Sequence, residues 1–183
     1  MPILVHHDIP GIKELLLTKP AEAAQKMKLL HQLGAHIPSA QLGTANDELI
    51  PETRVVCYSD SLLWTFTNAT IDLMAYEKHA SVIHGYLKRK GIDSYYVISS
   101  TGADDIEDNL SGTGAQYLDG NNIPLFASVP YSRTQCFRNI LAVEKRASAK
   151  KWRYTGYVCE PRTSSCVEGI LDTFDGFVVR KIV

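Results

Sequence analysis

Residues 54–66, RVVCYSDSLLWTF, decide how this chain is expected to fold. Residues 54–58 and 62–66 are mostly β-branched, aromatic or otherwise apolar, whereas Ser59, Asp60 and Ser61 between them are small and polar. This profile predicts two buried strands joined by a tight turn that carries a carboxylate. Asp favours turns because its side chain bonds its own backbone, so Asp60 has either this local role or a chemical one.

The composition is that of one globular domain. The chain has 183 residues, 45% of them hydrophobic, so residues 1–183 are expected to share one core. A net charge of −1 gives no surface suited to nucleic acid or an anionic membrane. The sequence has neither the roughly 20-residue apolar run of a membrane helix nor the pattern of a secretion signal. We therefore expect a cytoplasmic protein without nucleic-acid or membrane partners.

The four cysteines, Cys57, Cys136, Cys159 and Cys166, are scattered and form no Cys-x-x-Cys pair. A zinc knuckle is therefore not expected, and free thiols in a reducing compartment fit the spacing. The alternative is a bridge between Cys159 and Cys166 across a hairpin.

Helical and extended patterns alternate along the rest of the chain. Helices are expected over residues 12–34, broken at Pro20 and ended by Gly34, over residues 68–91, capped by Asn68, and over residues 132–147. Strands are expected over residues 3–7, 94–99, 115–118, 153–159 and 176–183. This order predicts an α+β fold, a palm-like or ferredoxin-like sandwich with a mostly antiparallel sheet flanked by helices.

Asp8 follows the first expected strand, and Asp60 lies at the tip of the hairpin. Consecutive elements usually neighbour each other, so both carboxylates are expected at the same edge of the sheet. Two such carboxylates repel unless a cation lies between them, and Mg²⁺ held by one or two carboxylates and substrate phosphates satisfies this need. Gly11 and the helix after it add backbone that a phosphate can approach.

Two short motifs resemble those of a known family. Residues 7–13, HDIPGIK, resemble the D-I-x-G-F/I motif of class III nucleotidyl cyclases, and residues 58–61, YSDS, resemble the hairpin that carries their second metal-binding aspartate. The F-S-D-S form of this hairpin is familiar from the cyclases of Pycsar anti-phage defence, which make cyclic UMP or cyclic CMP. The resemblance covers residues 3–91 and fades afterwards.

The resemblance implies a metal-dependent reaction. Asp8, Asp60 and the carbonyl of Ile9 would hold two Mg²⁺ or Mn²⁺ ions, and the ribose 3′-hydroxyl would attack the α-phosphate in line. The nucleoside triphosphate would lie against six further residues, Gly11, Ile12, Val56, Tyr58, Ser59 and Arg133. Such cyclases work as homodimers, and a defence cyclase is coupled to a separate cyclic-nucleotide-sensing effector.

The chain also departs from the family pattern. Purine-specific members carry Lys or Glu where Val56 stands, which favours a pyrimidine base here. The transition-state Asn and Arg of the family, which lie four residues apart on a late helix, are not evident. Only Thr134 and Arg138 have this spacing, with Arg133 and Asn139 adjacent to them, so Arg138 is a candidate for the catalytic arginine. The R-G pair expected before the fourth strand is also missing. A divergent cyclase, another palm nucleotidyltransferase and a binding module without activity all remain open.

Other residues receive simpler interpretations. His6 and His7 point to opposite faces of a strand, so at most one can join Asp8, and one packed and one exposed histidine are expected. His79 and His84 are expected at the surface, and Trp64, Tyr95 and Tyr96 in the core. Lys13 and Arg54 lie near the expected phosphate region, where each can equally be solvated. Ser59 and Ser61 have no nearby histidine to act as a base, which disfavours a hydrolase.

Overall fold

The computed structural model describes residues 3–36, 53–68, 70–101, 134–163 and 168–182. Its strands are β1 (Ile3–Asp8), β2 (Thr53–Tyr58), β3 (Ser61–Phe66), β4 (Tyr95–Ser100), β5 (Gly156–Pro161), β6 (Ile170–Phe174) and β7 (Phe177–Lys181). Its helices are α1 (Ile12–Thr18), α2 (Pro20–His36), α3 (Leu73–Arg89) and α5 (Gln135–Ala149). The expected strand at residues 115–118 and Arg133 lie outside the described residues.

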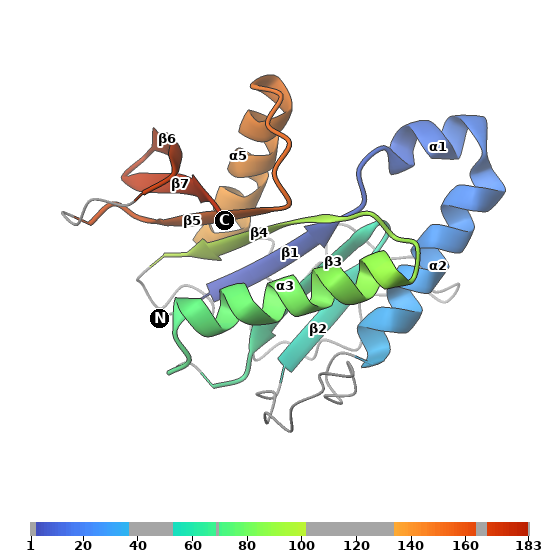
Figure 1. Cartoon of the computed structure of the whole chain (residues 1–183), viewed down its shortest axis with the longest axis horizontal. Coiled ribbons are helices and arrows are strands. Elements are labelled where there is room, and N and C mark those ends of the chain that lie inside the picture. The colour runs from blue at the N-terminus through green and yellow to red at the C-terminus, as the bar shows by residue number, and fades with distance from the viewer. Residues whose placement is uncertain (1–2, 37–52, 69, 102–133, 164–167, 183) are drawn as a thin grey trace.

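The strands form one sheet in the order β2-β3-β1-β4-β5-β7-β6 (Figure 1). Every neighbouring pair is antiparallel except β4 and β5, which run parallel. The chain is therefore an α+β protein with a mostly antiparallel sheet, as the order of elements predicted.

Helices cover both faces of the sheet, and alternate strand residues point into two cores. Ile3 and Val5 of β1 pack with residues of α2 and α3, whereas Leu4 packs with α5. Figure 1 shows α3 running along the near face of the sheet. Asp8 has the same parity as Leu4, so its side chain belongs to the α5 face.

The predicted central hairpin is confirmed. β2 and β3 pair from Thr53↔Phe66 to Tyr58↔Ser61, which leaves Ser59 and Asp60 as a two-residue turn. Ser59 has a φ of 50°, the left-handed conformation that such turns require. All six residues of β3 are buried, so this hairpin forms part of the centre of the molecule.

Two local predictions were wrong, and one strand was not predicted. Gly34 does not end a helix: α2 continues to His36, and a Cβ at Gly34 would overlap Cys57 Sγ and Leu62 Cδ1, so this glycine allows the helix to approach the sheet closely. Asp72 rather than Asn68 caps α3, because its carboxylate accepts a hydrogen bond from the Ala75 amide at 2.9 Å. The edge strand β6 was not predicted.

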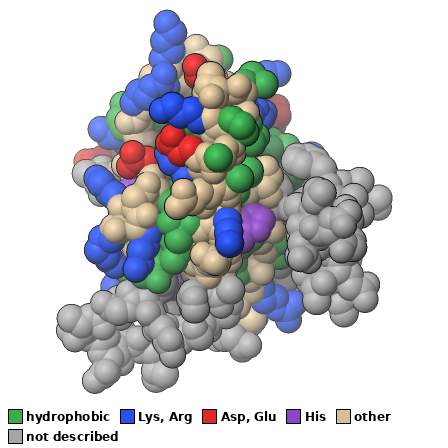
Figure 2. Space-filling model, turned by 90° about the vertical axis from the view of Figure 1, so that its right-hand side faces the viewer, with side chains coloured by type: hydrophobic (Ala, Val, Ile, Leu, Met, Phe, Trp, Pro, Cys, Tyr) green, Lys and Arg blue, Asp and Glu red, His purple; other side chains and the backbone are tan. Residues whose placement is uncertain are grey.

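The structure also bears on the cysteines and on membrane-spanning helices. Cys57, Cys136 and Cys159 are free thiols, so the alternative bridge from Cys159 is not formed. No helix in the described ranges is long and apolar enough to cross a membrane. The described part of the face shown in Figure 2 mixes basic, acidic and hydrophobic side chains, and no single kind covers it.

Candidate functional site

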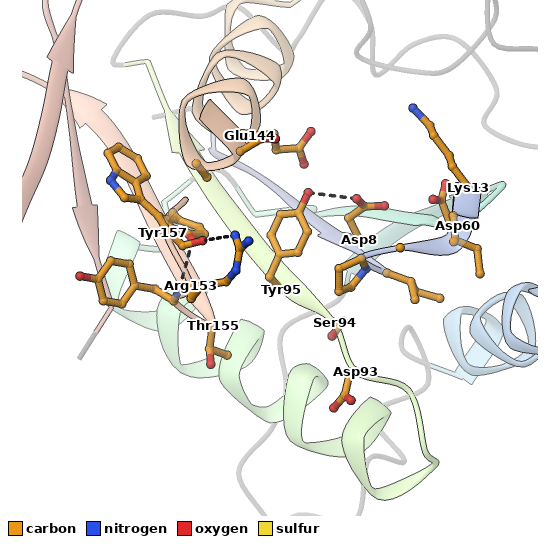
Figure 3. A pocket seen from close by; sticks show the side chains of 18 residues that line it. Asp8, Lys13, Asp60, Asp93, Ser94, Tyr95, Glu144, Arg153, Thr155 and Tyr157 are labelled. Carbon is orange, nitrogen blue, oxygen red and sulfur yellow. Dashed lines mark hydrogen bonds between the residues drawn. The ribbon is translucent and has the colours of Figure 1, made fainter. Parts of the chain in front are cut away.

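A cavity of about 870 Å³ opens at one edge of the sheet (Figure 3). Strand register brings its walls together: Asp8 at the end of β1 lies opposite Ser61 of β3 and Tyr95 of β4. The start of β5 joins the same edge, because Gly156 pairs with Tyr96 in the parallel ladder. The cavity therefore collects residues from both halves of the chain.

Asp8 is the most constrained carboxylate of the cavity. Tyr95 Oη donates a hydrogen bond to Asp8 Oδ2 at 3.0 Å, and Ser61 Oγ lies 3.5 Å from Oδ1. Burial raises the pKa of Asp8 to about 6, with further contributions from the charges of Asp60 and Glu144, against the opposing effect of His6. The negative charge of ionised Asp8 is therefore energetically unfavourable, and a bound cation would stabilise it.

Asp60 lines the same cavity from the β2–β3 turn. Its side chain is partly exposed and lies on the Asp8 side of the cavity in Figure 3. The predicted convergence of Asp8 and Asp60 at one edge of the sheet is confirmed.

Glu144 of α5 is a third carboxylate of the cavity, which sequence reasoning missed. His6 Nδ1 lies 2.5 Å from Glu144 Oε1, and His6 is only 4% exposed. Burial lowers the pKa of His6, but the charge and hydrogen bond of Glu144 outweigh this effect, so the pKa is raised. The pair fixes Glu144 beside the Tyr95 hydroxyl. No local pattern predicts it, since its members are 138 residues apart.

The expectation of one packed and one exposed histidine was wrong, because His6 and His7 are both buried on opposite faces of β1. His79 is also buried rather than at the surface, with its ring 4.9 Å from that of Trp64. Burial lowers the pKa of His79 to about 4, so this histidine is a neutral part of the core.

Two basic residues face the carboxylates. Lys13 of α1 stands on the Asp60 side of the cavity, and Arg153 lies on the opposite side, between Tyr95 and Tyr157 (Figure 3). Arg153 Nη1 donates to the carbonyl of Trp152 at 3.0 Å. Lys13 was noted in the sequence as a candidate near phosphate, whereas Arg153 was interpreted only as the start of a strand.

The Arg153 side of the cavity is aromatic. The Trp152 and Tyr157 rings stack with centroids 6.0 Å apart, and Tyr95 meets Tyr157 edge-on. Trp64 and Tyr96 lie in the core, as predicted, whereas Tyr95 lines the cavity.

The other candidate residues divide into two groups. Ile9, Gly11 and Ile12 line the cavity with Asp8. Val56, Ser59 and Arg138 are not among its lining residues.

Each residue of the second group has other surroundings. Val56 packs against the α5-side core, and the Ser59 carbonyl accepts a hydrogen bond from His31 on α2 at 2.8 Å. Arg138 is exposed near the start of α5, where it donates to the Gln135 side chain. The Tyr58 side chain and Arg133 lie outside the described residues.

In the described part of the chain, no three His, Cys, Asp or Glu side chains are close enough to hold a metal ion together. This arrangement suits Mg²⁺ better than a structural metal, because Mg²⁺ commonly takes one or two carboxylates and completes its shell with water and substrate phosphates. Asp8, Asp60 and the Ile9 carbonyl fit that requirement, and the raised pKa of Asp8 favours a cation beside it.

Comparison of the chain with protein-family models, with curated proteins and with solved structures finds no match. The function is therefore argued from the cavity and its residues.

Proposed function

We propose that this chain is a metal-dependent nucleotidyl cyclase that converts UTP or CTP to the 3′,5′-cyclic monophosphate and pyrophosphate. The observation that carries the proposal is the convergence of Asp8 and Asp60, from two separate motifs, on one cavity that also contains Lys13. Carboxylates that share a cavity with basic residues suit a polyphosphate substrate bound through divalent cations.

The fold supports the same proposal. The order β2-β3-β1-β4, with α2 and α3 packed on one face, supports the proposal of a ferredoxin-like or palm-like sandwich. The strand end that carries Asp8 and the hairpin tip that carries Asp60 are adjacent in this arrangement. Strands β5, β7 and β6 extend the sheet beyond β4.

The residues at the Asp8 and Asp60 end of the cavity, called the acidic end below, each have a defined task in the proposed reaction. Asp8, Asp60 and the Ile9 carbonyl would hold Mg²⁺ or Mn²⁺, two ions per site, which supply charge neutralisation and activation of the attacking hydroxyl when bound. The Tyr95 hydroxyl fixes the orientation of Asp8 by its hydrogen bond. Lys13 binds the phosphate oxygens that lie beyond Asp60.

The pyrimidine substrate follows from the sequence resemblance, in which an apolar residue replaces the polar residue of purine cyclases; the Val56 side chain itself packs against the α5-side core and does not line the cavity. Arg138 donates to Gln135 and is not among the residues that line this cavity, so we assign it a catalytic part only at a site shared with a second subunit. We accordingly propose a homodimer that signals to a separate cyclic-nucleotide-sensing effector in anti-phage defence.

Product identification tests the proposal directly. Purified protein is incubated with ATP, GTP, CTP or UTP and Mn²⁺, and the products are identified by mass spectrometry. We expect one cyclic pyrimidine monophosphate, and its loss in Asp60→Asn. Asp175→Asn is the matched control, because Asp175 is also a hairpin-turn carboxylate but is not among the residues that line the cavity.

Other products would select the alternatives. A linear or dimeric nucleotide would identify another palm nucleotidyltransferase. A folded protein that makes no product and shows no Mn²⁺-dependent thermal shift with any of the four nucleotides would be a binding module in which Asp8 and Asp60 are turn residues.

A further inference from the structure

We propose that the aromatic end of the cavity, formed by Trp152, Arg153 and Tyr157, binds the substrate's nucleobase, and that Arg153 donates hydrogen bonds to a carbonyl oxygen of that base. This inference rests on the proposed function, because it takes the substrate to be a nucleoside triphosphate with its phosphates at Asp8 and Asp60. It assigns base recognition to the segment between α5 and β5.

The cavity has two chemically different ends. Asp8, Asp60 and Lys13 lie on one side, and Arg153 and Tyr157 on the other, with Tyr95 between them (Figure 3). Trp152 lines the cavity as well and stacks on Tyr157. A nucleoside triphosphate has the same polarity, with a charged polyphosphate at one end and a planar ring at the other. Matching like with like places the phosphates at the acidic end and the base at the aromatic end.

The aromatic end is held by packing and hydrogen bonding within the protein. Tyr157 is 2% exposed and stacks on Trp152, and its hydroxyl accepts a hydrogen bond from the Tyr154 amide at 3.2 Å. Lys150 Nζ lies 5.6 Å from the centroid of the Trp152 ring. Tyr157 is buried and supports Trp152, which is half-buried and lines the cavity, so the exposed part of the indole is the aromatic surface that a base can contact.

The Arg153 guanidinium has N–H donors that are available to a ligand. The other arginines of this sheet region are paired: Arg146 with Asp172, and Arg180 with Glu77 and Glu160. Arg153 makes no ion pair with any described carboxylate, although it shares a cavity with four, and its bond to the Trp152 carbonyl uses one of its five N–H donors. The remaining donors match carbonyl acceptors rather than amino groups.

Glu144 occupies the middle of the cavity. It lies above Tyr95, between the acidic and aromatic ends, in Figure 3, and His6 fixes its position. The ribose of a nucleotide placed as above lies at this level. Glu144 is thus positioned to accept a hydrogen bond from a ribose hydroxyl, which supports the orientation proposed for the base.

This arrangement predicts a base preference. Uracil presents two carbonyl oxygens, cytosine one and adenine none, so Arg153 favours UTP over CTP and disfavours ATP. Loss of a hydrogen bond from a charged donor weakens binding roughly tenfold or more.

The test compares two ligands of the intact protein by calorimetry in the presence of Mn²⁺: UTP and inorganic tripolyphosphate, which has no base. We expect Arg153→Gln to weaken UTP binding roughly tenfold or more and leave tripolyphosphate binding unchanged. Arg153→Lys keeps the charge but not the planar fork and should weaken UTP binding similarly. Arg162→Gln, an exposed arginine after β5 that is not among the cavity residues, is the control and should change neither.

Each other outcome has one meaning. An equal loss of both ligands in Arg153→Gln, with rescue by Arg153→Lys, would make Arg153 a phosphate ligand and overturn the base assignment. Tripolyphosphate binding as tight as that of UTP in the unmodified protein would also overturn it while leaving the phosphate site intact. Binding of neither ligand would instead refute the proposed function.

Discussion

Replacing Asp8 by Asn should make the protein more stable and inactive at once. The pKa of Asp8 is raised from its ordinary value of 3.8 to about 6, chiefly by burial and then by Asp60 and Glu144, so its ionised form destabilises the fold. This penalty is fully present above pH 6 and disappears as the pH falls toward 3.8. Asn carries no charge and its carbonyl can still accept the hydrogen bond from Tyr95.

The magnitude follows from the shift. A difference of about two pKa units corresponds to roughly 3 kcal/mol of unfolding free energy, since one unit is about 1.4 kcal/mol. Asp8 is partly exposed to the cavity, so solvent screening reduces the expected gain to about 1–2 kcal/mol, or about 2–8 °C in Tm.

The assay is urea and thermal unfolding of both proteins in EDTA at pH 8 and at pH 4.5. We expect the gain at pH 8 and a much smaller one at pH 4.5, with nucleotide turnover lost. A variant that is less stable than the parent at pH 8 would refute the reasoning, because it would mean that the Asp8 charge holds the fold together. Asp175→Asn is the control, and its stability should match that of the parent protein at each pH within about 0.5 kcal/mol.

Three further predictions concern the scaffold. His79 has a pKa of about 4 in the folded protein against an ordinary 6.5, so its contribution to stability should fall by about 2 kcal/mol between pH 8 and pH 5, and His79→Phe should remove this part of the pH dependence in urea titrations. Gly34→Ala should lower the free energy of unfolding by about 1–3 kcal/mol, because its Cβ would overlap Cys57 and Leu62. Gly85→Ala within α3 should raise it by about 0.5–1 kcal/mol, because its Cβ would meet only the end of Arg89 at an ordinary distance. Thermal unfolding compares the two variants, and equal effects would contradict the packing argument. Thr134→Ala should cost about 1 kcal/mol in the same assay by removing the 3.1 Å bond that Thr134 Oγ1 accepts from the Phe137 amide, and Thr134→Ser should retain it.

The central hairpin and the acidic end of the cavity were predictable because their signals are local. The apolar runs around Ser59 and Asp60 specify two strands and a tight turn within thirteen residues, and strand adjacency then places Asp8 beside them. The edge strand β6 had a local signal too, since Asp175 and Gly176 form a turn with φ of 48° and 81°. That Asp-Gly pair predicts a hairpin and was overlooked.

Gly34 and His79 mark where local reasoning fails. A glycine near the end of an apolar helix is typical of a C-cap, but here it permits close contact with Cys57, which no sequence window reveals. His79 is polar by type, yet its position on α3 directs it against Trp64. In both cases the partner comes from another element, and packing overrides residue type.

The sequence by itself determined the α+β class, the hairpin and the pair Asp8 and Asp60, because these depend on periodicity, turn chemistry and neighbouring strands. Only the tertiary structure decided that Glu144 and Arg153 enter the cavity while Arg138 does not. One physical reason is the path of α5, because its last turns reach the cavity edge of the sheet and its first turn lies away from it. The other is the parallel β4–β5 ladder, which brings the segment before β5 to the same edge. Contacts across 138 residues, such as His6 with Glu144, depend on that packing and leave no trace in local sequence.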